Sequence, residues 1–138
     1  DVYDLATDTW STAALSQPRF GLAATNAGGK VFFAGGASNS GLSNVVDVYD
    51  LASGTWSVLR LSTARVFLAA VGASGKAYFA GGEPLNGRYA TTIDVYDVPS
   101  QTWSAARLSV ARTNLTAAST GNQIYFAGGD AGTGKAFN

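Results

Sequence analysis

The sequence predicts an all-β fold built from one tandem repeat, and two motifs carry that prediction. The tetrapeptide FAGG occurs three times, at residues 33–36, 79–82 and 126–129. The tetrapeptide DVYD recurs with the same spacing, 46 and then 47 residues, starting at Asp1, Asp47 and Asp94. Aligned without gaps over 36 positions, the three copies share 16 identical residues. We therefore expect a single domain over residues 1–138, made of repeats 1–46, 47–93 and 94–138.

Each repeat is predicted to form four short antiparallel strands. In the middle of the chain these are the segments 45–51, 55–59, 67–73 and 77–82, which are rich in β-branched, aromatic and small residues. Glycine-containing turns interrupt them too often for helices of ordinary length. About 46 residues with four antiparallel strands match one blade of a β-propeller. With the strands of a blade called a to d from the axis outward, the small residues after Leu22, Leu68 and Leu115 predict the inner strand a.

The invariant tryptophans and glycines are predicted to build the blades. Trp10, Trp56 and Trp103 carry the largest apolar surface of each repeat, and we expect them to pack between blades. The glycine pair of FAGG is expected to end strand b with a positive φ. A phosphate-binding loop is the alternative for this pair, but neither a helix nor a Lys-Ser/Thr pair follows it.

The repeated aspartates have two interpretations. Asp47 and Asp50, with their counterparts in the other repeats, could form a paired-carboxylate or calcium site. Residues three apart in a strand, however, point to opposite faces of the sheet. Asp50 also precedes a tight turn, where a carboxylate accepts hydrogen bonds from free backbone N–H groups. We therefore expect these aspartates to be structural.

Composition excludes several classes of function. The chain has no histidine and no cysteine, which removes Ser-His-Asp and Cys-His catalysis and cysteine zinc sites. Nine basic residues balance nine acidic ones without a basic stripe, so we expect no nucleic-acid partner. No apolar run is long enough to span a membrane. We predict no metal and no cofactor, and the abundance of Ala, Gly, Ser and Thr leans towards a secreted, extracellular bacterial protein.

The order of motifs resembles the kelch repeat. A glycine pair that closes an aromatic strand is followed by a tyrosine and then by a tryptophan, as in residues 33–56 and again in 79–103. The resemblance covers essentially the whole chain and implies a kelch-type β-propeller. Kelch-like propellers serve as adaptors, as carbohydrate binders and occasionally as enzymes. The enzymatic alternative resembles galactose oxidase, whose copper site uses two histidines that this chain lacks. We therefore predict a non-enzymatic scaffold.

The candidate binding site lies on the rim where the b-to-c and d-to-a connections are expected to meet. In kelch-like adaptors an arginine before the inner strand faces the binding mouth, which implies this role for Arg19, Arg65 and Arg112. The alternative is that each arginine pairs with the carbonyl oxygens or a carboxylate of a neighbouring blade. Recognition usually lies on loops held by a rigid scaffold. The predicted ligand-binding set adds Phe20, Phe67 and Asn114 beside the arginines, and Asn39, Asn44, Glu83, Asn86, Arg88, Tyr89 and Asp130 on the loops, for a peptide, protein or glycan ligand.

The repeats also predict assembly. The first residues correspond to strands c and d of a blade and the last to strands a and b, with two complete blades between them. Three blade-equivalents are too few to close, because closed propellers have about four to eight blades. We expect a homodimer that forms a six-bladed ring with two composite blades. The alternative is that the chain is a fragment or an engineered half of a larger propeller, without an independent function.

Overall fold

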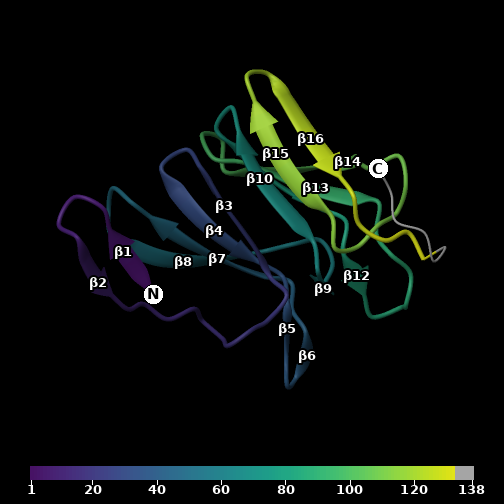
Figure 1. The fold of residues 1–138 in the computed structure, drawn as a ribbon, viewed down its shortest axis with the longest axis horizontal. Coiled ribbons are helices and arrows are strands. Elements are labelled where there is room, and N and C mark those ends of the chain that lie inside the picture. The colour runs from purple at the N-terminus through teal and green to yellow at the C-terminus, as the bar shows by residue number, and fades with distance from the viewer. Residues whose placement is uncertain (133–138) are drawn as a thin grey trace.

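The computed structural model describes residues 1–132 and is all-β (Figure 1). Its strands form two four-stranded antiparallel sheets and four smaller pairs. The first blade consists of β3 (Ala23–Ala27), β4 (Lys30–Ala34), β7 (Val45–Asp50) and β8 (Thr55–Arg60), paired in that order. The second blade consists of β10 (Ala69–Ala73), β11 (Lys76–Ala80), β13 (Thr92–Asp97) and β14 (Thr102–Arg107), also in chain order.

Two-stranded pairs flank the blades. The N-terminal pair is β1 (Val2–Asp4) with β2 (Thr9–Ser11), and the C-terminal pair is β15 (Thr116–Thr120) with β16 (Gln123–Ala127). Within residues 1–132 no sheet closes on itself, so the described chain is an open arc. These residues form no helix, and hence none that is long and apolar enough to cross a membrane.

The first strands of successive units lie side by side, as expected for the inner strands of a propeller. Strand β10 contacts both β3 and β15. The approach is closest at Gly72, where an added Cβ would lie 1.7 Å from the carbonyl oxygen of Asn26 on β3. Only a residue without a side chain fits at this position.

The core lies between the two blades. Phe32 of the first blade is fully buried and packs edge-on against Phe79 and Tyr96 of the second, with ring centroids 6.2 and 5.9 Å apart. Trp103 packs partly buried against the same cluster. A second cluster joins the second blade to the C-terminal pair through Leu115 and the partly buried Phe126. Aromatic side chains thus fill the space between neighbouring sheets in both clusters.

The glycine pairs end strand b in the way that the sequence predicts. Gly35 and Gly36 have φ angles of +68° and +94°, a region that L residues rarely adopt. A Cβ at Gly35 would lie 2.6 Å from the carbonyl oxygen of Arg65, which accepts a 2.9 Å hydrogen bond from the Gly36 N–H. The close approach of two backbones therefore requires glycine, and no helix follows.

The aspartates of DVYD are structural as expected. One carboxylate oxygen of Asp50 accepts hydrogen bonds from the backbone N–H groups of Ala52 and Ser53, at 2.9 and 3.1 Å. The other contacts the ammonium group of Lys30 on the neighbouring strand β4. Asp97 repeats both interactions with the Ser100 N–H and with Lys76.

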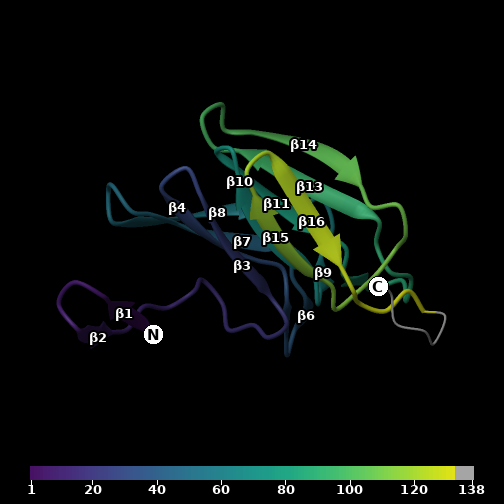
Figure 2. The same ribbon diagram turned by 45° about the horizontal axis from the view of Figure 1, so that its top comes forward.

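The expectation for the tryptophans needs correction. Only Trp103 packs between two blades; Trp56 is 40% exposed and Trp10 is 70% exposed. Trp56 lies against Phe33 and Tyr49 of its own blade, and Trp10 lies against Tyr3 of its own pair. The N-terminal pair stands apart from the first blade (Figure 2). The faces that carry Trp10 and Trp56 therefore lack the sheet that covers the face of Trp103.

Candidate functional site

The candidate site is one end of the molecule, where the connections between strands meet. We call this end the rim and define it by residues 17–22, 37–44, 63–68, 83–91, 111–115 and 130–132. In each unit the d-to-a connection pairs with the residues that follow the glycine pair: Phe20 with Ala37, β9 (Arg65–Val66) with β12 (Glu83–Pro84), and Thr113 with Asp130. The short pair β5 (Ala37–Ser38) and β6 (Gly41–Leu42) lies at the same end as β9 and β12 (Figure 1). The remainder of the third b-to-c loop, residues 133–138, lies outside the described residues.

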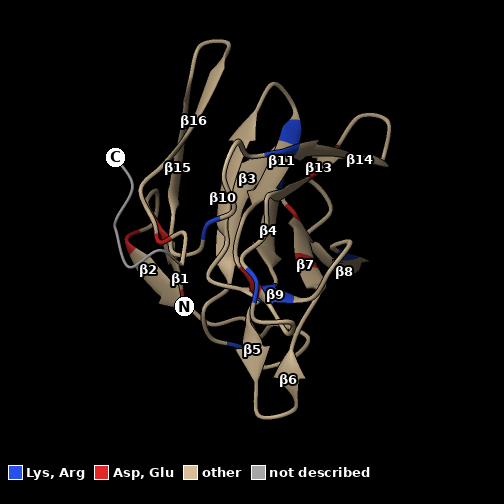
Figure 3. Cartoon of the chain, turned by 90° about the vertical axis from the view of Figure 1, so that its right-hand side faces the viewer, with Lys and Arg blue, Asp and Glu red and all other residues tan. Residues whose placement is uncertain are grey.

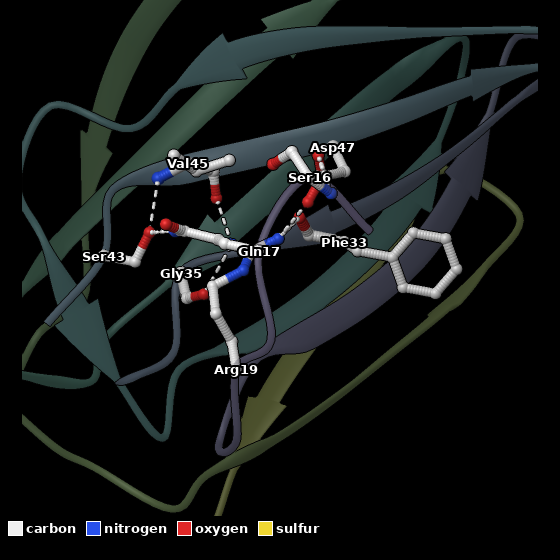
Figure 4. Close-up of polar contacts among 8 residues, drawn as sticks. All are labelled: Ser16, Gln17, Arg19, Phe33, Gly35, Ser43, Val45 and Asp47. Atoms are coloured by element: carbon white, nitrogen blue, oxygen red, sulfur yellow. Dashed lines mark hydrogen bonds and ion pairs between the residues drawn. The ribbon is translucent and has the colours of Figure 1, made fainter. Parts of the chain in front are cut away.

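The three repeated arginines of the rim, Arg19, Arg65 and Arg112, point into the blades. Arg65 is fully buried and donates hydrogen bonds to the carboxylate of Asp94 at 2.8 Å and to the carbonyl oxygen of Phe79 at 3.0 Å. Arg19 has the same arrangement with Asp47 and with the carbonyl oxygens of Gly35 and Val45, at 2.7 Å each (Figure 4).

The third arginine, Arg112, is also buried and donates to the carbonyl oxygen of Gly128. Burial lowers the pKa of Arg19, and the adjacent Asp47 opposes that shift. The side chains proposed for the binding mouth thus lie beneath it. The geometry is that of the alternative interpretation, in which each arginine pairs with a carboxylate or with carbonyl oxygens and holds the ends of strands b and c together.

Exposed aromatic rings lie above this buried layer. Phe20 is 61% exposed and Phe67 is 38% exposed. Phe67 has a φ of +56°, which is unusual for a bulky residue, and the residues at the same repeat position, Gly21 and Asn114, have φ angles of +62° and +53°. Backbone hydrogen bonds hold this conformation: the Phe67 N–H donates to the Gly21 carbonyl at 2.8 Å, and the Asn114 N–H donates to the Phe67 carbonyl at 2.9 Å. These three positions therefore link successive units around the mouth.

The loop residues divide into paired and exposed groups. The Tyr89 hydroxyl donates to the Asp130 carboxylate at 3.0 Å, across two units, and this hydrogen bond raises the pKa of Tyr89. Asn44 bonds to the outer strand and is structural, since it donates to the Leu61 carbonyl and accepts from the Arg60 guanidinium. Glu83 is half-buried on β12. The exposed residues are Asn39, Asn86, Arg88 and Asn114.

Two hollows lie on the rim. One, of about 480 Å³, is lined by residues 17–20 and 37–40, and it includes Phe20 and Asn39. The other, of about 320 Å³, lies at the corresponding place in the second blade, between Thr63 and the loop that carries Asn86, Arg88 and Tyr89. Gln17, Pro18 and Ser38 were not among the predicted residues, because nothing in their local sequence separates them from ordinary turns. The pairing of the d-to-a connection with the b-to-c loop, at Phe20 and Ala37, brings them to the hollow.

Comparison with known proteins supports the kelch assignment. The kelch motif family model matches residues 18–60, which run from the d-to-a connection through β8. No curated protein sequence matches the chain. Among solved structures, the one titled "Structure of YjhT" aligns with a TM-score of 0.79 at 23% identity. The alignment covers 98% of this chain and 46% of that chain, so this chain spans less than half the length of its structural match. The kelch resemblance of the sequence is thereby confirmed, in a propeller fold that is open within residues 1–132.

Proposed function

We propose that this kelch-repeat chain is a non-enzymatic scaffold that binds a polar ligand, a peptide, protein or glycan, on the rim. Kelch repeats occur mainly in scaffolds of this kind, and the proposal extends that general role to the rim loops. The arginines support the loops from beneath. The exposed groups of Phe20, Phe67 and Asn114, together with those of the loops around the two hollows, make the contacts.

The observation that carries the proposal is the backbone of Phe67. A bulky aromatic residue at φ +56° costs free energy that glycine or asparagine at the same repeat position largely avoids. Burial of the ring is incomplete, because Phe67 stays 38% exposed. A strained residue that presents an exposed ring is typical of a binding surface.

The charge distribution favours a polar, uncharged contact. Lysine, arginine, aspartate and glutamate are scattered along the part of the chain that the structure describes (Figure 3). The buried arginines are neutralised by carboxylates in the two complete blades. Aromatic rings beside amide and hydroxyl groups suit sugar faces and extended peptides, where stacking and neutral hydrogen bonds provide affinity.

The test is to screen glycan and peptide arrays with the wild-type chain and to measure the binders against Phe67→Asn. This change places at Phe67 the residue that the third repeat already carries in the same backbone conformation, so the fold is retained. We expect affinity to fall at least tenfold with no loss of thermal stability. Val58→Ser, at an exposed site on β8, is the control and should leave binding unchanged. Binders that are insensitive to Phe67→Asn would contradict the assignment of the site.

A further inference from the structure

We propose that Asn86 and Gly87, at the tip of the second b-to-c loop, form a site of spontaneous deamidation that the loop holds in a reactive arrangement. Asn86 is the one asparagine of the sequence that a glycine follows. The reaction consumes water and needs no ligand, so it is independent of the function proposed above. Only its effect on binding rests on that function.

The loop tip presents both reacting residues to water. Asn86 and Gly87 are exposed, as are their neighbours Leu85 and Arg88. Asparagine is thermolabile because the backbone nitrogen of the next residue can attack its side-chain amide. A side chain on that next residue would shield the nitrogen, and glycine has none. An added Cβ at Gly87 would also meet no described atom within 4 Å, so no neighbouring segment covers the site.

The side chain of Asn86 is folded towards the nitrogen that would attack it. Its Oδ1 accepts a 3.1 Å hydrogen bond from the backbone N–H of Arg88. This hydrogen bond closes an Asx turn, which keeps the amide carbon Cγ beside the nitrogen of the intervening residue, Gly87. Holding the reacting atoms together before the reaction lowers its entropic cost.

The same hydrogen bond stabilises the charge that the attack creates. When the Gly87 nitrogen adds to Cγ, Oδ1 becomes an oxyanion, and the Arg88 N–H already donates to that oxygen. The Gly87 N–H donates a long hydrogen bond, 3.3 Å, to the carbonyl oxygen of Pro84. A bond of that length is weak, so freeing the nitrogen for the attack costs little.

The reaction proceeds in two steps. The Gly87 nitrogen loses its proton to solvent and forms a bond to Cγ of Asn86, and the bond from Cγ to the amide nitrogen breaks, which releases ammonia and leaves a five-membered succinimide. Water then opens this ring. Attack at Cγ gives aspartate, and attack at the main-chain carbonyl gives isoaspartate, in which the chain runs through the former side chain. The sum is one water consumed and one ammonia released, with no change of oxidation state.

The product changes the charge of the second hollow of the rim. Asn86, Arg88 and Tyr89 line this hollow of about 320 Å³ together with Arg65, whose charge Asp94 balances. A carboxylate at position 86 places a negative charge two residues from Arg88, where the unreacted chain has a neutral amide. Isoaspartate also lengthens the main chain of the loop by one atom. The rim therefore acquires a second chemical state with time.

The first experiment follows the reaction in the 138-residue chain, kept at body temperature and mildly alkaline pH and digested with trypsin at intervals. Cleavage after Lys76 and Arg88 releases peptide 77–88, in which Asn86 carries the only side-chain amide. We expect its conversion to aspartate and isoaspartate at least tenfold faster than any conversion in peptide 31–60, which contains Asn39 and Asn44. An isoaspartyl methyltransferase labels the isoaspartate. No conversion, or equal rates in the two peptides, would overturn the proposal.

A glycine variant tests the chemistry of the attack. Gly87→Ala adds a methyl group beside the nitrogen in open space, at a φ of +68°. We expect conversion of Asn86 to slow at least tenfold. Gly41→Ala is the matched control, since Gly41 also has a positive φ, +112°, and open surroundings on another loop of the rim. It should leave the rate at Asn86 unchanged. A rate in Gly87→Ala equal to that of the wild type would overturn the assignment of the attacking nitrogen.

A comparison with the free peptide tests the contribution of the fold. Synthetic peptide 77–88 carries the same residues without the constraint of the blade. We expect Asn86 to react at least as fast in the folded chain as in this peptide, because the Asx turn is held in place there. Slower reaction in the folded chain would show that the loop protects Asn86, and it would overturn the reactive arrangement.

The effect on binding is measured with Asn86→Asp, which has the charge of the product. For a neutral ligand of the rim, we expect affinity to fall at least threefold. Asn122→Asp, at an exposed turn between β15 and β16 away from the rim, is the control and should bind as the wild type does. Equal affinities of wild type and Asn86→Asp would overturn the link to binding. If no ligand is found, the proposed function fails, whereas the peptide analysis still decides the deamidation.

Discussion

The buried side chain of Arg65 joins a rim connection to the strands of the second blade. Its guanidinium lies out of water between the carboxylate of Asp94 and the carbonyl oxygen of Phe79, so it connects the d-to-a connection to strands b and c. Moving the two charges out of water costs free energy. The attraction between them offsets that cost only while both partners are present. The pair therefore orders the rim more than it stabilises the fold.

We predict that Arg65→Ala destabilises the chain by about 3 to 5 kcal/mol, the range for removing one partner of a buried ion pair. The loss comes from the buried carboxylate of Asp94, which is left without its cation. Chemical denaturation measures it. Arg88→Ala, at an exposed arginine of the rim, is the matched control and should change stability little. A small loss for Arg65→Ala together with weaker ligand binding would instead support a direct role of Arg65 at the mouth.

Strand pairing within each blade carries a second ion pair at the opposite end of strands b and c. Lys30 contacts Asp50, and Lys76 contacts Asp97, beside the turn that each carboxylate caps. The lysine hydrogen bond, with help from the backbone N–H groups, lowers the pKa of Asp50 and of Asp97 to about 2. The carboxylates are therefore more acidic in the folded state than in the unfolded chain.

The sign of this shift predicts acid destabilisation. A carboxylate with a lowered folded pKa stabilises the fold fully above its unfolded pKa, near 3.8, and loses this effect as the pH falls towards about 2. We expect the thermal midpoint of the wild type to fall between pH 4 and pH 2. The double variant Asp50→Asn, Asp97→Asn should start from a lower midpoint and change less over that interval. Parallel curves for the two proteins would contradict the contribution of these pairs.

The sequence predicts elements better than it predicts their surroundings. The strands, the glycine pairs and the aspartate caps follow from residue types that dictate local conformation, so the repeat is sufficient to place them. The burial of Arg19 and the exposure of Trp56 depend on which sheet lies opposite, and no local signal reports it. The cross-unit hydrogen bond of Tyr89 to Asp130 lies between two variable loops, where the repeat carries no information.

At the scale of the whole molecule, the solvent exposure of the three tryptophans shows which faces of the sheets are covered. They occupy the same position in three repeats, yet Trp103 packs against the core while Trp56 is 40% exposed and Trp10 is 70% exposed. Trp56 and Trp103 have equivalent aromatic neighbours within their own blades, so the difference between them lies in the neighbouring sheet. Trp10 has the equivalent tyrosine, Tyr3, without the phenylalanine of strand b.

We therefore predict that acrylamide quenching ranks the three tryptophans by the exposure of their rings. Variants that keep one tryptophan, with phenylalanine at the other two positions, isolate each signal. The Trp10-only protein should be quenched most and the Trp56-only protein to an intermediate degree, because Trp10 is 70% exposed and Trp56 is 40% exposed. The Trp103-only protein should be quenched least, because its ring packs against the core between two blades. Equal quenching of the three proteins would contradict this order and would mean that the rings of Trp10 and Trp56 are covered in solution.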